Sequence, residues 1–139
     1  MFKNILVAYD GSDCANQAAQ TAGEIASKFG GEILILYAFH PIPRHWGDTL
    51  REKAVSEEIT QGNLLVNNVV DRLRAAGVHV EGQVVEGMPH EAIAKMARRR
   101  NIDLIVIGSN GMGETASYLL GSVSDKVVHR AACSVLVVR

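Results

Sequence analysis

The sequence predicts a single α/β domain, in which helices cover both faces of an open five-stranded parallel sheet. Three observations support this prediction. Short aliphatic runs alternate with longer segments of helical periodicity along the whole chain. The 139 residues suffice for one hydrophobic core but are too few for two. Aromatic residues make up only 5% of the chain, so we expect a core of valine, isoleucine, leucine and alanine.

The first half of the chain predicts two buried strands and two helices. Continuous aliphatic runs are typical of strands that are buried on both faces, and apolar residues at steps of three and four are typical of a helix with one inner face. Glycine-containing turns separate these segments. The expected elements are a strand over 5–9, a helix over 13–29, a strand over 33–39, an irregular proline-containing segment over 40–47 and a helix over about 48–76.

The second half predicts three more strands and two helices. Residues 78–85 alternate apolar and polar side chains, which is typical of a half-exposed strand at a sheet edge. Residues 103–107 are aliphatic after the first position, which favours a buried strand. The other expected elements are a short helix introduced by Gly87 and Pro89, a helix over 122–130 and a last strand over 134–138.

The order of the strands in the sheet follows from their connections and their hydrophobicity. Strands that are separated by helices run parallel, with right-handed crossovers. The first and fourth strands are the most apolar and are expected at the centre, which gives the spatial order 3-2-1-4-5. The winding direction reverses between these two strands, and ligands bind beyond the carboxyl ends of strands at such a reversal. We therefore expect the ligand site at the loops after Tyr9 and Ile107.

Charge and hydropathy exclude several classes of partner. The chain has 14 Lys and Arg against 15 Asp and Glu, whereas nucleic-acid-binding proteins usually carry a clear basic excess. No apolar run approaches the roughly 18 residues of a membrane span. Cys14 and Cys133 lie far apart without metal-ligand spacing, and no signal peptide is recognised. We expect a cytoplasmic protein with reduced thiols that binds neither nucleic acid nor a membrane.

Both loops at the reversal are rich in glycine and short polar residues. Glycines let backbone N–H groups approach an anion closely, and the positive end of a helix that begins at Ser122 favours a phosphate. The alternative is that Gly108 only ends a strand and Ser122 only caps the helix. Their convergence on one point of the sheet favours the anion site. A P-loop is excluded, because the chain has no Gly-Lys-Ser/Thr triplet.

The spacing of these glycines resembles that of the ATP-binding universal stress proteins. Gly108, two residues, Gly111, nine residues and then Gly121-Ser122 match the family motif G-2x-G-9x-G-S/T. The start of the chain (NILVAYDGSD) and its end (DLIVIGSNG…LLGSVSDKVVHRAACSVLVVR) are similar to the same family, so that the resemblance spans the whole chain. The chain departs from the family pattern at Asn110, where a basic residue or histidine is frequent, and at Glu114, which adds a negative charge.

The resemblance implies that the site binds ATP, accompanied by Mg²⁺ or Mn²⁺. It implies that the glycine-rich backbone lines the triphosphate and ribose, and that Ser122 and Ser124 donate hydroxyls. Asp10, with the backbone of Ala8 and Ala38, is expected near the adenine. The implied nucleotide-binding residues are Ala8, Asp10, Ala38, Gly108, Gly111, Gly121, Ser122, Val123 and Ser124.

For the function, the resemblance implies a nucleotide-responsive stress or signalling protein that works through conformation or protein partners. Two alternatives stay open: a slow ATPase or a nucleotidyl or phosphoryl transferase, and a dimeric scaffold with a vestigial site. No catalytic set stands out, and the glycine-rich loop has no Lys or Arg to neutralise a transferred phosphoryl group. The last strand, 134–138, is an apolar edge without a protecting Lys or Pro, which favours a homodimer paired through this strand. Residues 40–47 are expected to order over a bound base.

Overall fold

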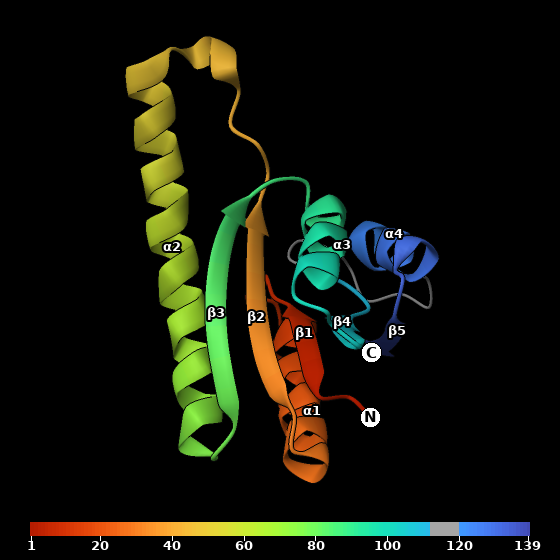
Figure 1. Ribbon diagram of the computed structural model, residues 1–139. Helices are drawn as coiled ribbons and strands as arrows, with labels where there is room; N and C mark the ends of the chain where they lie inside the picture. Colours follow the sequence, from red (N-terminus) through yellow and green to blue (C-terminus); the bar gives the residue numbers. More distant parts are fainter. Residues whose placement is uncertain (112–119) are drawn as a thin grey trace.

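The fold comes from a computed structural model that describes residues 1–111 and 120–139 (Figure 1). Its elements are, in chain order, β1 (Asn4–Ala8), α1 (Asp13–Phe29), β2 (Glu32–Phe39), the 3₁₀ helix η1 (Arg44–Trp46), α2 (Asp48–Ala75), β3 (His79–Glu86), α3 (Pro89–Arg99), β4 (Leu104–Gly108), α4 (Ser122–Arg130) and β5 (Ser134–Val138). The predicted limits of the strands and of the longer helices lie within one residue of these. The sequence does not predict η1, because three residues beside two prolines carry no helical periodicity.

The strands form one parallel sheet in the order β3-β2-β1-β4-β5, which confirms the predicted order. The central strand β1 pairs with β2 on one side and with β4 on the other, so the winding direction reverses at β1 and β4. The edge strand β3 is largely exposed or half-buried, as its alternating pattern predicts. The carboxyl ends of β1, β2 and β4 therefore meet at one edge of the sheet.

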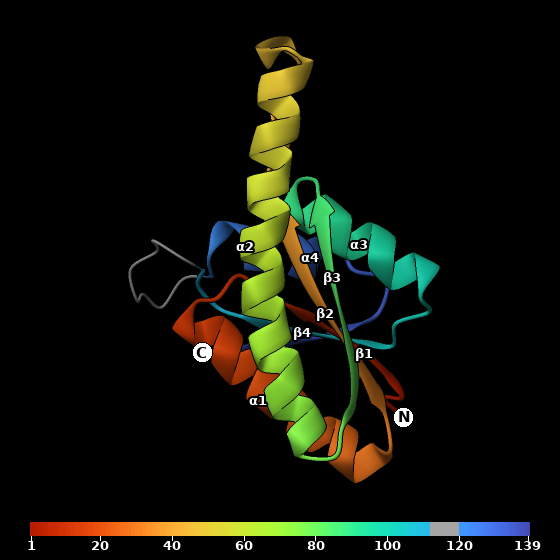
Figure 2. The same cartoon turned by 90° about the vertical axis from the view of Figure 1, so that its left-hand side faces the viewer.

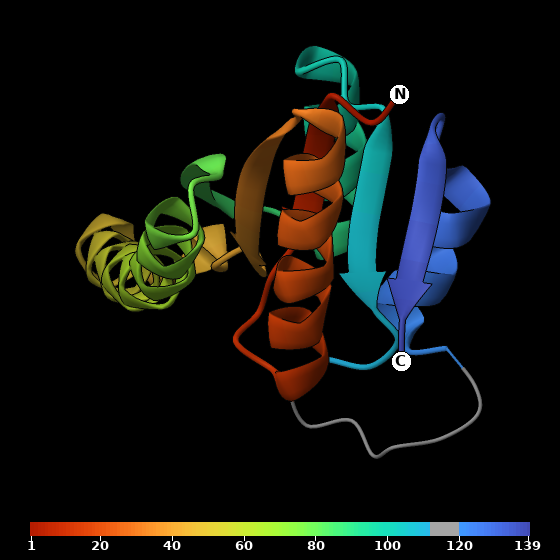
Figure 3. The ribbon, with the colours of Figure 1, turned by 90° about the horizontal axis from the view of Figure 1, so that it is seen from below.

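Each face of the sheet carries its own hydrophobic core, because successive side chains of a strand point to opposite faces. Ile5 and Val7 of β1 point toward α1 and α2, whereas Leu6 points toward α3 and α4. All three side chains are fully buried, which explains why this run is aliphatic without interruption. Figure 3 shows α1 on one face of the sheet and α4 on the other.

The helix α2 is longer than the sheet that it covers. Val66, Val69 and Val70 in its second half are buried against the sheet. Its first turns project with η1 beyond the end of the sheet (Figure 2). Among the described residues, no helix has both the length and the apolar composition needed to cross a membrane.

Candidate functional site

A cavity of about 550 Å³ lies at the carboxyl ends of β1, β2 and β4, where the winding direction reverses. The first residues of α1, α3 and α4 also line it, so that three helix N-termini surround one space. The structure brings all nine residues expected at the nucleotide site into the lining of this cavity: Ala8, Asp10, Ala38, Gly108, Gly111, Gly121, Ser122, Val123 and Ser124.

Asp10 is held between the loop after β1 and the loop after β4. Its Oδ1 accepts a hydrogen bond from the Ser12 N–H at 2.9 Å, and the Ser12 Oγ in turn accepts from the Ala15 N–H at 3.2 Å, which caps α1. A Cβ at position 111 would lie only 2.6 Å from Asp10 Oδ2. Glycine at 111 therefore lets the second loop approach the carboxylate closely.

Gly108 allows a second close approach, between β4 and the start of α1. A Cβ at this position would lie 2.6 Å from the Cys14 Cβ and 2.8 Å from the Cys14 carbonyl carbon. The Ser124 hydroxyl donates to the Gly108 carbonyl at 2.5 Å, and the Ser109 N–H donates to the Val138 carbonyl at 2.8 Å. These contacts fix the end of β4 against both α1 and α4.

The first turn of α4 bears on two statements made from the sequence. The N-cap is Gly121, without a side-chain cap, so the alternative in which Ser122 only caps the helix is wrong. Ser122 is instead the first helical residue, and its side chain is exposed. The Ser124 proton is used by the Gly108 carbonyl, although we expected this hydroxyl to be donated to a ligand. In this structure Ser124 therefore ties α4 to β4.

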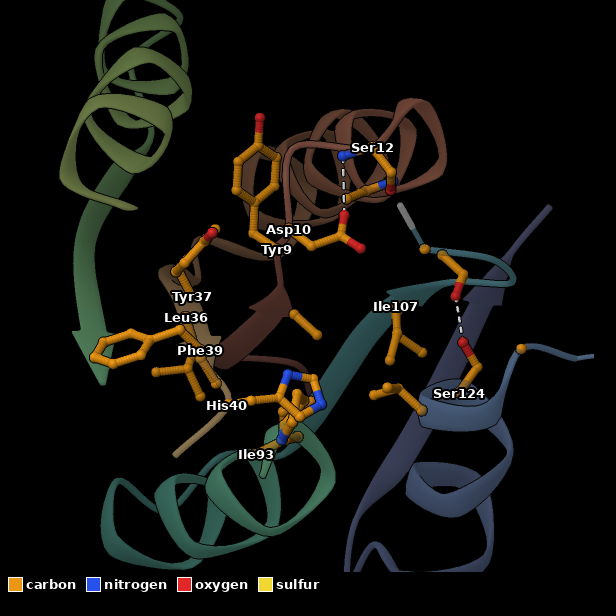
Figure 4. Close-up of a pocket in the computed structure, with 18 of the residues that line it drawn as sticks. Tyr9, Asp10, Ser12, Leu36, Tyr37, Phe39, His40, Ile93, Ile107 and Ser124 are labelled. Atoms are coloured by element: carbon orange, nitrogen blue, oxygen red, sulfur yellow. Dashed lines mark hydrogen bonds between the residues drawn. The ribbon is translucent and has the colours of Figure 1, made fainter. Parts of the chain in front are cut away.

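The wall of the cavity on the β2 side is apolar, and sequence reasoning missed most of it. Leu36, Tyr37 and Phe39 of β2 line this side of the cavity together with Ile93 of α3, and Figure 4 labels all four. Leu36 and Ile93 belong to the core on one face of the sheet, whereas Tyr37 packs against the core on the other face. The reversal of winding direction in the sheet indicates only the loops after β1 and β4 as a ligand site. The expected pairing of β2 with β1 could have indicated this wall as well, because it places the end of β2, where Ala38 was already expected at the site, beside the end of β1.

The segment after β2 is fastened to the neighbouring elements by Glu86, the last residue of β3. Glu86 Oε2 accepts hydrogen bonds from the Ile42 N–H at 2.9 Å and from Arg51 Nη2 at 2.6 Å. These two bonds hold the pKa of the Glu86 carboxyl below its ordinary value. Residues 40–42 line the cavity, whereas Trp46, in the same segment 40–47 that is expected to order over a bound base, is exposed and does not line it.

Negative charge predominates around the cavity. Among the described lining residues, Asp10 and Glu58 are carboxylates and none is Lys or Arg. Burial raises the pKa of Tyr37, and the negative charges of Glu58 and Asp10 raise it further. Glu114 and the rest of 112–119 lie outside the described residues.

No group of three His, Cys, Asp or Glu among the described residues is arranged to hold a metal ion by itself. A Mg²⁺ ion that binds with a nucleotide needs only one or two protein carboxylates, since phosphates and water complete its shell. Asp10, beside the glycine-rich loop, fits that requirement.

Comparison with known proteins identifies one family over the full length of the chain. A family model described as "Universal stress protein family" matches residues 1–139. A universal stress protein from Thermus aquaticus is 37% identical over 145 residues, and the match covers 100% of both chains.

Solved structures give the same result. The universal stress protein UspA from Lactobacillus plantarum has a TM-score of 0.90 at 26% identity, with 99% of this chain and 98% of that chain covered. A universal stress protein in complex with cAMP has a TM-score of 0.77 at 28% identity, with 99% and 97% covered. One from Archaeoglobus fulgidus in complex with dAMP shares the fold at 22% identity, with a TM-score of 0.69 and both chains fully covered.

The two close glycine approaches predict different effects for the same substitution. Gly111→Ala places a methyl group against Asp10 Oδ2, the end of a side chain that can turn aside, so it should displace the carboxylate from the cavity and lower stability less than the change at Gly108. Gly108→Ala meets backbone and Cβ atoms of Cys14, which cannot move aside, and should lower stability by about 1–3 kcal/mol. Urea unfolding of both variants tests this difference. An equal loss of stability in both would contradict it.

The contacts of Glu86 predict a pH dependence of stability. Because the pKa of Glu86 is lowered in the folded state, its contribution is complete above the unfolded pKa, near 4.5, and is lost as pH falls through the folded pKa. The free energy of unfolding of Glu86→Gln should therefore differ most from wild type at neutral pH. Urea unfolding from neutral pH down to a pH well below 4.5 measures the difference, with the exposed Glu57→Gln as control. A difference that stays constant over this range would contradict the assigned contacts.

Proposed function

Since the chain belongs to the universal stress protein family, we propose that it binds an adenine nucleotide in the cavity at the carboxyl end of the sheet. Binding would act through the conformation of the surrounding loops or through a protein partner. The observation that supports this most directly is that one cavity collects all nine residues implied by the family motif. The complex of a related structure with cAMP supports the same ligand class.

The size and lining of the cavity suit such a ligand. Small-molecule sites commonly measure about 300–1,000 Å³, are largely apolar, and carry a few convergent polar groups. Tyr37 and Phe39 on the β2 side offer a surface for a base. The glycine-rich backbone and the start of α4 offer N–H groups and a positive helix end for a phosphate.

The apolar side at β2 and the glycine-rich side at α4 together suggest how the nucleotide is oriented in the cavity. The adenine would lie toward β2, against the apolar wall, and the phosphate would lie toward Gly111 and Ser122. Asp10 lies between the two sides, where the ribose would pass, and a carboxylate accepts hydrogen bonds from ribose hydroxyls. When ATP is the nucleotide, Mg²⁺ or Mn²⁺ would neutralise phosphate charge, with Asp10 as the nearest protein ligand.

Binding is favoured over phosphoryl transfer. Transfer depends on cationic groups that stabilise charge on the phosphoryl oxygens. The described part of the lining supplies the carboxylates of Asp10 and Glu58 instead of a guanidinium or ammonium group. A protein that senses a nucleotide needs only the binding groups.

We also propose a homodimer that pairs through β5, as the apolar edge strand indicates. The Ser109 N–H donates to the Val138 carbonyl, so Val138 turns its peptide groups toward β4. Because peptide groups alternate along a strand, Val137 turns its own toward the outer edge. The β5 strand of a second copy, antiparallel and related by a two-fold axis, would form hydrogen bonds with these outward-facing N–H and C=O groups.

A substitution at the start of α4 tests the phosphate side of the proposed site. A hydroxyl bonded to a charged phosphate is worth about 1.5–3 kcal/mol, so Ser122→Ala should weaken AMP binding about ten- to a hundredfold. Titration calorimetry measures the affinity. Ser134→Ala, an exposed serine at the far end of β5, is the matched control. Wild-type affinity in Ser122→Ala would place the phosphate elsewhere.

The proposed dimer is tested at an outward-facing position of β5. Val137→Pro removes an N–H at the outer edge while the ladder to β4 keeps its bonds, so light scattering should show a monomer. Circular dichroism confirms that the variant is folded. A dimeric Val137→Pro protein, or a monomeric wild type at micromolar concentration, would rule out pairing through β5.

A further inference from the structure

We propose that the cavity is built for an adenine nucleotide with a single phosphate, and that it accepts a triphosphate only together with a divalent cation. This inference rests on the proposed function and specifies its ligand. It follows from the charges around the cavity and from the few groups that face the phosphate side.

The fixed charges of the lining oppose a polyphosphate. Asp10 and Glu58 are its carboxylates, and no described lining residue is Lys or Arg. The loop from Gly108 to Ser124 contains no Lys or Arg at any position of its sequence. No side chain of this loop can therefore neutralise a phosphate.

Two arginines on the neighbouring helix α2 are engaged elsewhere. Arg51 Nη2 donates to Glu86 Oε2 at 2.6 Å, and Arg72 Nη2 donates to Asn16 Oδ1 at 3.1 Å. Each of these contacts joins elements of the fold. Turning either guanidinium toward a nucleotide would cost the contact that it now makes.

Among the described residues, the groups that remain for a phosphate are the glycine-rich backbone, the start of α4 and the Ser122 hydroxyl; none carries a full positive charge, so they suit one phosphate better than three. A helix N-terminus is equivalent to about half a positive charge, and its effect falls off within the first turn. A phosphate monoester carries about −1.5 to −2 at neutral pH. The start of α4 with the Ser122 hydroxyl matches that charge in part, whereas the further phosphates of ATP would add negative charge near Asp10 without a cation.

Asp10 lies where its negative charge would repel the further phosphates of ATP. Its Oδ1 accepts a hydrogen bond from the Ser12 N–H, and its Oδ2 would lie 2.6 Å from a Cβ at position 111, so the carboxylate lies where the base side passes into the phosphate side.

Titration calorimetry on the full chain tests the inference with AMP and ATP, each in EDTA, and with ATP in excess Mg²⁺. In EDTA, ATP should bind at least about tenfold more weakly than AMP, and Mg²⁺ should remove most of this difference. ATP that binds in EDTA as tightly as AMP overturns the inference and leaves the proposed function standing. Failure of every adenine nucleotide to bind overturns the proposed function itself.

Two variants test the electrostatic cause. Glu58→Gln removes a lining carboxylate on the Tyr37 side of the cavity and should raise the affinity for metal-free ATP relative to AMP, by less than a change beside the phosphates does. Glu57→Gln changes the net charge by the same amount at an exposed position that does not line the cavity, and should leave the ATP-to-AMP ratio unchanged. Asn110→Arg supplies the missing cation and should raise the same ratio. An unchanged ratio in both Glu58→Gln and Asn110→Arg overturns the electrostatic inference.

Discussion

The site depends on the close approach of two loops that lie far apart in the chain. Gly108 brings the end of β4 against Cys14 at the start of α1, and Gly111 brings the next loop against the Asp10 carboxylate. A side chain at either position would fill the space that the opposite loop occupies. This approach places the start of α4 opposite the end of β1, with the cavity between them. The rest of the lining completes a space that the two glycines create.

The approach is possible because the central strands are rigid. Leu6 and Ile105 are fully buried on one face of the sheet, and Ile5 and Val106 on the other, so β1 and β4 are packed from both sides. Close-packed strands hold their ends in a fixed relation. The loops after these strands can therefore present backbone groups at defined positions without forming a helix or strand themselves. The apolar wall from β2 and the carboxylates add selectivity to that frame.

Much of this arrangement could be predicted from local patterns. The uninterrupted aliphatic residues of β1 and the alternation in β3 were enough to place one strand at the centre and the other at the edge. The glycine spacing after β4 indicated the polar half of the cavity. The contacts that hold residues 40–42 in place could not be predicted, because Glu86 lies 44 residues from Ile42 and 35 residues from Arg51 in the chain. The role of Ser124 was missed for the same reason, since its partner Gly108 lies in another element. Contacts of this kind depend on the assembled fold and leave no periodic signal in the sequence.

The central claim is that the nucleotide lies in the cavity between the loops after β1 and β4. Amide chemical shifts recorded while AMP is added to isotope-labelled protein test it most directly, since every described loop residue has its own signal. The account predicts saturable shifts at Asp10, Gly108, Gly111 and Ser122, the residues on either side of the glycine approach. A second hollow of about 310 Å³ lies at the amino ends of the strands, beside Asn4, His79 and Arg100. Shifts confined to that end of the sheet would contradict the account.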